Sequence, residues 1–339
     1  MRRKILISLV TCLLVLSIIV GGCTSMENKA VTATKKYPDK PITLIVPFGV
    51  GGANDLLARL LEKSASTHLG QPLVIINKPG GAGTLGWNEL SGASPDGYTL
   101  GLTGVELILQ PLYGPTKYHY PTALEPLVQI STQSIVMAIQ ADQPWEKLND
   151  LITHAKQHPG QIKFGHGGIS TINHLTGETF ARAANINLEQ VPFQSGAEVV
   201  ASLLGNHIQV AFVTPASVKE HVKSGKLRVL AIGGDQRSPD PIFSNVPTFK
   251  EQGLNVIGNS WYGIAAPKGL PLEVKNKLES GFKKIINDPE FKRNLEQLGL
   301  QVAYLGSKES EKQWLSDGEK LIKMVTETGI LEEIKAQKK

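Results

Sequence analysis

The chain has 339 residues, of which 41% are hydrophobic and 19% are charged, and its formal net charge is +5. Three of the basic residues lie within the first four positions, and the rest of the chain carries 32 basic and 30 acidic side chains. Since no cluster of Lys or Arg and no nucleic-acid motif follows, this pattern excludes nucleic acid as an expected partner. Two cysteines, Cys12 and Cys23, exclude a disulfide framework, so stability must come from burial in about two domains.

The N-terminus has the pattern of an export signal. Residues 2–4 are basic, residues 5–20 form an almost unbroken apolar run, and Gly21-Gly22-Cys23 follows, which is the order of a signal peptide and its cleavage site. A retained membrane span is the alternative, but the run is at the short limit for spanning and ends at small residues. The pattern resembles bacterial lipoproteins, which implies that residues 1–22 are removed and that Cys23 is lipidated. Residues 23–38 are then expected to form a flexible tether.

Apolar runs and helical patterns alternate from residue 42 onward. Short runs rich in Ile, Leu and Val indicate strands that are covered on both faces, and leucines at helical spacing indicate the helices between them. In this half the predicted strands are residues 42–48, 73–77, 98–103 and 134–140, and the predicted helices are residues 55–68 and 145–158.

A glycine-rich turn, Gly49-Val50-Gly51-Gly52, joins the first strand to the first helix. Glycines allow the backbone to approach whatever lies above the strand end. Asn54 is expected to cap the helix, which leaves unpaired N–H groups that point at the same place and favour an anion there. Asp55 is interpreted as charge that complements the helix dipole or braces the loop, with a catalytic role as the alternative.

Three further strand–turn–helix units follow. The first turn is His166-Gly167-Gly168-Ile169-Ser170-Thr171. In the second unit, Ser195 and Glu198 have the spacing of a capping box, and in the third, Thr214 is a cap that precedes Pro215 at the first helical position. The predicted strands of this region are residues 162–165, 190–193, 208–213 and 227–232.

These units predict an α/β fold with two parallel or mixed sheets flanked by helices. Residues 233–260 are irregular and return the chain to the first lobe, where residues 261–266 form another strand and residues 272–335 are mostly helix. A segment inserted between two halves of another lobe creates a cleft, and ligands of α/β folds bind beyond the carboxyl ends of strands. We expect residues 39–139 and 233–339 in lobe 1 and residues 140–232 in lobe 2.

Several of these turns share motifs with one family. The motifs are Pro47-Phe48-Gly49-Val50-Gly51-Gly52-Ala53-Asn54-Asp55, Asn77-Lys78-Pro79-Gly80-Gly81-Ala82-Gly83, Pro95-Asp96-Gly97-Tyr98-Thr99-Leu100, Val191-Pro192-Phe193-Gln194-Ser195-Gly196, Gly225-Lys226-Leu227-Arg228-Val229-Leu230-Ala231, Val246-Pro247-Thr248 and Ala266-Pro267-Lys268-Gly269-Leu270-Pro271. In this order the chain resembles the substrate-binding receptors of tripartite tricarboxylate transporters, the Bug family. The resemblance implies a bilobed periplasmic-binding-protein fold that closes on a small carboxylate and delivers it to a membrane permease. Thr84, His166 and Val213-Thr214 depart from the family pattern next to the expected cleft, so the carboxylate itself is not implied.

The expected ligand site combines strand ends and helix beginnings from both lobes. Residues 48–55 form one jaw, residues 166–173 and 194–196 oppose it, and backbone N–H groups and hydroxyls hold the ligand before a hinge closes. The aromatic residues among the candidates serve either as cleft walls or as core. The candidate ligand-binding residues are Phe48, Gly51, Gly52, Ala53, Asn54, Asp55, Thr103, His166, Ser170, Thr171, Asn173, Phe193, Gln194, Ser195, Gly196, Thr214 and Trp261.

Other chemistry fits the motifs less well. Gly81-Ala82-Gly83-Thr84-Leu85-Gly86 matches a dinucleotide fingerprint, but no acidic residue ends the next strand, so the turn is expected to pack a helix or to border the cleft. His166 and His174 lack metal-ligand spacing, and Ser170 and Ser195 lack a nucleophile elbow. No catalytic residue, cofactor or metal is predicted.

The sequence therefore predicts an exported, lipid-anchored and monomeric receptor on the extracytoplasmic face of the membrane, in the periplasm or at the cell surface. Its expected partners are a small organic carboxylate, which is a di- or tricarboxylate or an aromatic acid, and the integral membrane subunits of a transporter. Two alternatives stay open: an exported hydrolase-like enzyme, and a receptor that reports its ligand to a partner protein without transport.

Overall fold

The computed structural model describes residues 36–256, 258–327 and 329–337. The chain divides at residue 36, and the unit that carries the strands and helices is Tyr37–Lys339. The expected signal peptide, Cys23 and nearly all of the expected tether lie outside the described residues. No helix in the described ranges has both the length and the apolar character needed to cross a membrane.

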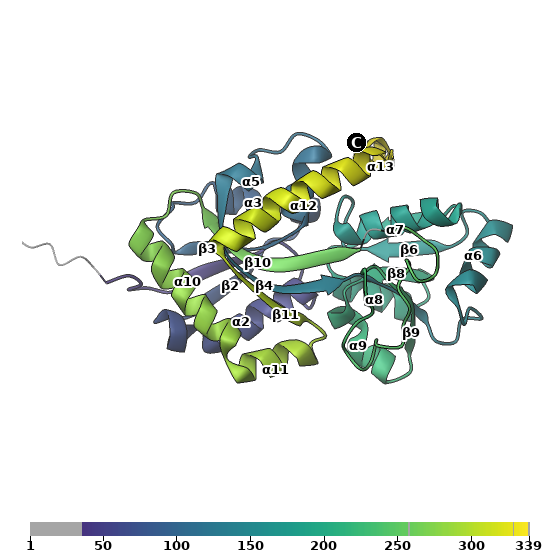
Figure 1. Ribbon diagram of the computed structural model, residues 1–339, viewed down its shortest axis with the longest axis horizontal. Coiled ribbons are helices and arrows are strands. Elements are labelled where there is room, and N and C mark those ends of the chain that lie inside the picture. Colours follow the sequence, from purple (N-terminus) through teal and green to yellow (C-terminus); the bar gives the residue numbers. More distant parts are fainter. Residues whose placement is uncertain (1–35, 257, 328, 338–339) are drawn as a thin grey trace, which may run out of the picture. The chain divides into compact units, whose positions relative to one another are not determined.

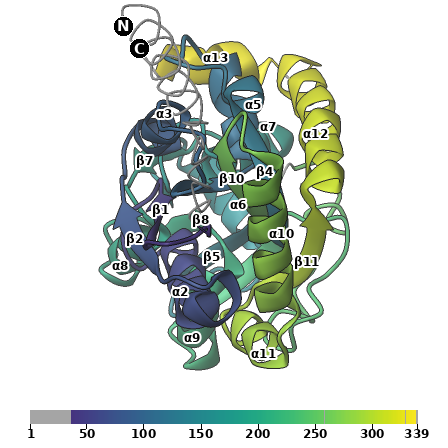
Figure 2. The same cartoon turned by 90° about the vertical axis from the view of Figure 1, so that its left-hand side faces the viewer.

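The first sheet contains six strands within the described part of the chain, in the order β11-β4-β10-β3-β1-β2 (Figure 1). β1 pairs in parallel with β2 and β3, whereas β10 is antiparallel to β3 and β4, and β11 is antiparallel to β4. Helices α2, α10 and α11 contact one another beside this sheet (Figure 2). The strands are β1 (Ile42–Val46), β2 (Leu73–Asn77), β3 (Thr99–Gly104), β4 (Leu124–Ser134), β10 (Asn259–Pro267) and β11 (Gln301–Gly306), and the helices around them are α2 (Ala53–Leu69), α3 (Thr84–Ser91), α4 (Glu106–Leu109), α5 (Tyr120–Ala123), α10 (Leu272–Asn287), α11 (Pro289–Gln297) and α12 (Ser307–Glu327), with 3-10 turns at Gly81–Gly83 and Gln110–Leu112.

The second sheet has the order β7-β6-β8-β5-β9. β6 pairs in parallel with β7 and β8, and β5 is antiparallel to β8 and β9. Alternating side chains of β8 enter different clusters: Phe212 packs with Phe180 of α7, whereas Ala211 packs with Val199 of α8, so these two helices cover opposite faces. The elements are β5 (Val136–Gln140), β6 (Lys163–His166), β7 (Glu189–Pro192), β8 (Val210–Val213), β9 (Leu227–Ile232), α6 (Leu148–Gln157), α7 (Ile172–Ala184), α8 (Gly196–Leu204), α9 (Pro215–Lys223) and α13 (Ile330–Gln337).

The chain passes between the two sheets through closely packed backbone. The strand predicted at residues 134–140 is confirmed as β5, which begins at Val136, whereas β4, which ends at Ser134, was not predicted. The backbone changes sheets at Ile135. The N–H of Ile135 donates to the carbonyl of Gly258 at 2.6 Å, and the N–H of Gly233 donates to the carbonyl of Ile135 at 2.8 Å. A Cβ atom on Gly233 would lie 2.6 Å from the Cα of Gly258, so only glycine allows this approach.

Two local predictions are corrected by the structure. The region predicted as mostly helix at residues 272–335 contains β11, which exists because Gln301 to Gly306 pair with β4 far away in sequence. The first helix begins at Ala53 with Gly52 as its N-cap residue, so the prediction that Asn54 caps it is wrong. Asn54 already lies in the first turn, since the extended backbone of Gly52 precedes it.

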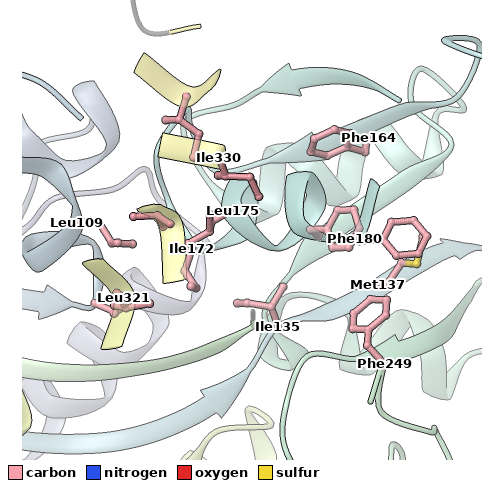
Figure 3. Close-up of a cluster of buried hydrophobic side chains, with 14 of the residues drawn as sticks. Leu109, Ile135, Met137, Phe164, Ile172, Leu175, Phe180, Phe249, Leu321 and Ile330 are labelled. Carbon is pink, nitrogen blue, oxygen red and sulfur yellow. The ribbon is translucent and has the colours of Figure 1, made fainter. Parts of the chain in front are cut away.

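One hydrophobic cluster joins elements of both sheets (Figure 3). Leu109 at the end of α4 and Leu321 of α12 belong to the same cluster as Ile172 and Leu175 of α7 and Ile330 of α13, and all five side chains are buried. Burial of each such side chain stabilises the fold by about 1.5–3 kcal/mol. The beginning of α7 is thus held by side chains from both parts of the fold.

Candidate ligand-binding site

The beginnings of α2, α7, α8 and α9 meet around one cavity in the described part of the chain. The cavity has a volume of about 40 Å³, and since one buried water needs about 10–15 Å³, it has room for a few waters. It is lined by Phe48, Gly52, Ala53, Asn54, Glu106, Gly167, Thr171, Ile172, Asn173, Ser195, Gly196, Thr214, Ser217, Ser260 and Tyr262.

Side-chain caps satisfy only some of the backbone donors at these helix beginnings. Ser195 Oγ accepts a hydrogen bond from Glu198 N at 3.3 Å, which confirms the predicted cap of α8. Thr171 Oγ1 accepts from His174 N at 3.3 Å and caps α7. In the described structure neither Gly52 nor Thr214 makes a side-chain cap, and both helices direct a positive dipole end at the cavity. α2 also leaves N–H groups of its first turn without a helical partner. α9 offers hydroxyls instead, because it begins with Pro215, which has no N–H, and the N–H of Ser217 donates to the carbonyl of Thr214 at 3.0 Å.

The two walls of the cavity touch through backbone atoms. The N–H of Gly49 donates to the carbonyl of Gln194 at 3.1 Å, although the two loops belong to different sheets. A Cβ atom on Gly49 would lie 3.2 Å from the Cβ of Ser195, and one on Gly52 would lie 3.4 Å from the backbone nitrogen of Gly196. The glycines of this turn therefore allow the two loops to close against each other.

Asp55 braces the turn from below rather than lining the cavity. Its side chain is buried and accepts hydrogen bonds from Gly51 N at 3.0 Å, Arg59 Nε at 3.1 Å and Asn77 Nδ2 at 3.0 Å. Burial by itself would raise the pKa of Asp55, but these hydrogen bonds and the charge of Arg59 lower the pKa overall. This geometry supports the bracing interpretation, since the three donors come from the turn, from α2 and from the end of β2.

His166 and Ser170 are buried behind the cavity wall. His166 Nε2 lies 2.7 Å from Gln190 Oε1, and its Nδ1 accepts from Gly168 N at 3.2 Å. Burial and the neighbouring His174 lower the pKa of His166 to about 3, so its ring is neutral and brings no positive charge to an anion. Ser170 donates from Oγ to Gln110 Oε1 at 3.0 Å.

The remaining candidates do not line the cavity. Gly51 and Gln194 belong to the touching loops without lining the cavity, and Phe193 packs against the second sheet's cluster. Trp261 stacks on Trp314 and donates from Nε1 to Asp317 at 2.8 Å, where it borders a separate pocket of about 570 Å³. Thr103 is buried in β3, with its hydroxyl against Gly263. The structure thus brings together Phe48, Gly52, Ala53, Asn54, Thr171, Asn173, Ser195, Gly196 and Thr214.

Six lining residues were not among the sequence candidates: Glu106, Gly167, Ile172, Ser217, Ser260 and Tyr262. Glu106 begins α4 just after β3, so an acid beyond a strand end was an available signal. Gly167 and Ile172 flank predicted residues, and Ser217 lies in the first turn of α9. Ser260 and Tyr262 reach the cavity because β10 pairs with β3 and β4, which local patterns do not reveal.

None of the described residues that line the cavity is Lys, Arg or His. Over the same described ranges, no group of three or more His, Cys, Asp and Glu residues has the arrangement to hold a metal ion. The arrangement is suited to binding by backbone N–H groups, hydroxyls and the amides of Asn54 and Asn173. A cavity of this kind between two α/β lobes defines the class of periplasmic solute-binding proteins.

Comparison with known proteins places the chain within that class. The model of the TctC family, described as the tripartite tricarboxylate transporter family receptor, matches residues 57–330, and the chain belongs to this family. The resemblance expected from the turn motifs and the bilobed α/β fold are both confirmed.

Individual proteins of known sequence or structure also match the chain. The chain is 32% identical to the UPF0065 protein in the gbd 5′ region of Cupriavidus necator over 288 residues, which cover 85% of this chain and 86% of that protein. It is 32% identical to Protein BugT of Bordetella pertussis over 240 residues, 69% of this chain and 72% of the relative. The solved structure of the periplasmic binding protein BugD is 27% identical, with a TM-score of 0.81 over 86% of this chain and 99% of that one.

Proposed function

We propose that this protein captures a small organic carboxylate in the cavity described above and delivers it to the membrane subunits of a tripartite tricarboxylate-type transporter. The observation that carries the proposal is the meeting of four helix beginnings at one cavity, counted over the described residues, in which no cationic side chain takes part. Helix N-termini bind anions because their free N–H groups and dipoles point at the same place.

The energy of such a site suffices without an arginine. A hydrogen bond to a charged group contributes about 1.5–3 kcal/mol, and micromolar affinity requires about 8 kcal/mol. Three to five bonds from the N–H groups of α2 and α8, the hydroxyls of Thr214 and Ser217 and the Asn54 and Asn173 amides reach that range. An apolar contact with Phe48 adds to it.

Closure of two lobes excludes water from the bound ligand in this proposal. The lobes follow the expected division into residues 39–139 and 233–339, and residues 140–232, except that β5 (Val136–Gln140) belongs to the second sheet and so moves with the second lobe. They rotate about the backbone crossings near Ile135 and Gly233. The bond from Gly49 N to Gln194 O supports this view, since it joins loops that only a closed arrangement brings within reach. Hinge motions of this kind move lobes as rigid bodies.

We further propose that the protein acts as a monomer, bound to the extracytoplasmic face of the membrane through lipid on Cys23. The apolar segment that ends in Gly21-Gly22-Cys23 supports the anchor. No bond of the ligand is broken in this function. An exported hydrolase remains the second candidate only if a bound ligand is turned over, and a sensing role only if binding occurs without transport.

Native mass spectrometry of the purified protein, followed by calorimetry with any small acid that co-purifies, tests the proposal. The acid is expected to bind, whereas its amide should lose most of the affinity because every N–H donor then faces a neutral group. Ser195→Ala should weaken binding by about 1–3 kcal/mol, and Ser202→Ala, which changes a serine on the same helix outside the cavity, serves as the matched control. Equal affinity for the acid and the amide refutes the carboxylate receptor.

A further inference from the structure

Glu106 is the acidic side chain that faces the cavity among the described lining residues. It is the first residue of α4, directly beyond β3, and only 6% of it is exposed. No Lys, Arg or His lines the cavity beside it, and within the described ranges no ion pair of Glu106 is formed. A buried carboxyl group repels an anionic ligand when no cationic side chain lies beside it, so the presence of Glu106 in this site has to be explained.

The carboxyl group of Glu106 lies at the beginning of α7. Its Oε1 accepts a hydrogen bond from the N–H of Ile172, the first residue of that helix, at 3.4 Å. Its Oε2 lies against Gly104, where a Cβ atom would approach it to 2.6 Å, so glycine at this position leaves room for the side chain. The α7 end of the cavity therefore already faces a carboxyl group that the chain itself supplies, whereas the ends of α2 and α9 have no side-chain cap.

We propose that Glu106 determines specificity, because it excludes a second ligand carboxylate from the α7 end of the cavity and accepts a hydrogen bond from a ligand hydroxyl or ammonium group there. The ligand class is then a monocarboxylate with a hydrogen-bond donor at its far end, held by its carboxylate at the other helix ends. This inference rests on the proposed carboxylate-binding function and narrows it.

Electrostatics agrees with this assignment. Burial raises the pKa of Glu106, because the charged carboxylate loses its hydration without gaining a cation from the protein. A ligand ammonium group supplies the missing positive charge, and a hydroxyl supplies a donor. A second carboxylate would instead bring two acidic groups together in a buried site without a cationic side chain, where one of them is driven to take up a proton.

Calorimetry at pH 7.5 on the full mature chain, with a matched panel of ligands, tests the role of Glu106. The panel contains the dicarboxylates from malonate to adipate and, for each, the ω-amino and ω-hydroxy acids in which one carboxylate is replaced by the donor. A donor-bearing monocarboxylate should bind at least about tenfold more tightly than the matched dicarboxylate, since a bond to a charged group is at stake.

The variant Glu106→Gln should reduce this preference at least about tenfold, while Glu62→Gln, the same change on an exposed part of α2, should leave it unchanged. The comparison of ligands on the unaltered protein needs no variant, so a folding defect in Glu106→Gln does not prevent a decision. A dicarboxylate that binds as tightly as its partner acids, or a preference that Glu106→Gln does not alter, overturns the role of Glu106 and leaves the carboxylate receptor intact. Binding of none of these acids also overturns this inference, while the native mass spectrometry and the comparison of acid with amide decide separately on the receptor.

Discussion

Replacing Asp55 by asparagine tests whether the Asp55 carboxylate fixes the conformation of the glycine turn. The two carboxylate oxygens accept from the Gly51 N–H, Arg59 Nε and Asn77 Nδ2 at 3.0–3.1 Å, and asparagine has the same shape but only one acceptor oxygen. At least one donor then faces the new NH₂ group. The buried charge-assisted bond that is lost contributes about 1.5–3 kcal/mol. The Arg59 side chain is 47% exposed, so its ion pair adds only up to about 1 kcal/mol.

Urea unfolding at pH 7 should therefore show Asp55→Asn to be destabilised by about 2–4 kcal/mol in the free energy of unfolding. The control Asp142→Asn, an exposed position outside the sheets, should change it by less than about 0.5 kcal/mol. Because hydrogen bonds lower the pKa of folded Asp55 below its ordinary value of 3.8, its contribution is fully present above that value. It is lost as the pH falls through the folded pKa.

The difference between the unaltered protein and Asp55→Asn should thus narrow below about pH 4. A loss of less than about 0.5 kcal/mol at pH 7, or a loss that stays constant down to pH 3, would refute the bracing role. Ligand affinity should fall as well, since the turn that includes Gly52 is no longer held in one place.

Three further outcomes are expected. In urea titration, Gly233→Ala should lower the free energy of unfolding by about 1–3 kcal/mol, because its methyl group would lie 2.6 Å from the Gly258 backbone. The control Gly167→Ala should leave the free energy of unfolding unchanged, because its methyl group meets nothing within 4 Å, and equal stability of the two variants would contradict the packing argument. Cys23→Ser should release the protein from the membrane fraction or leave it unprocessed, because stable anchoring requires more than one acyl chain, and unchanged membrane retention argues against the lipid anchor. Small-angle scattering should show a smaller radius of gyration at saturating ligand with little change in helix content by circular dichroism, and an unchanged radius would count against lobe closure.

The strand–turn–helix units that begin with β1, β6, β7 and β8 were predictable because their signals are local. Short apolar runs, the Ser195 cap and Pro215 at the start of α9 all act within a few residues. β4 and β11 were missed, since β4 carries Pro126 and several polar residues and β11 becomes a strand only by pairing with it. The cap of α2 was misassigned because Gly52 acts through its backbone and offers no side-chain signal.

Some of the residues that line the cavity could be predicted because they too carry local signals. Turns that precede helices, such as those with Ser195 and Thr171, can be recognised from caps and glycines. Whether a residue next to such a turn faces the cavity depends on tertiary packing, which turns His166 toward Gln190 and Trp261 toward Asp317. Tyr262 depends on the register of β10 against β3, and no pattern within β10 alone specifies it.

The backbone bond between the two walls also makes a natural reporter. The Gly49 amide donates to Gln194 across the closed loops, so any rotation that separates the sheets frees its hydrogen to exchange with deuterium in the solvent. Its exchange rate therefore measures the free energy of opening directly, without a label. A ligand that binds only the closed arrangement should slow this one amide in proportion to its concentration over its dissociation constant, so that a single resonance follows both the motion and the affinity.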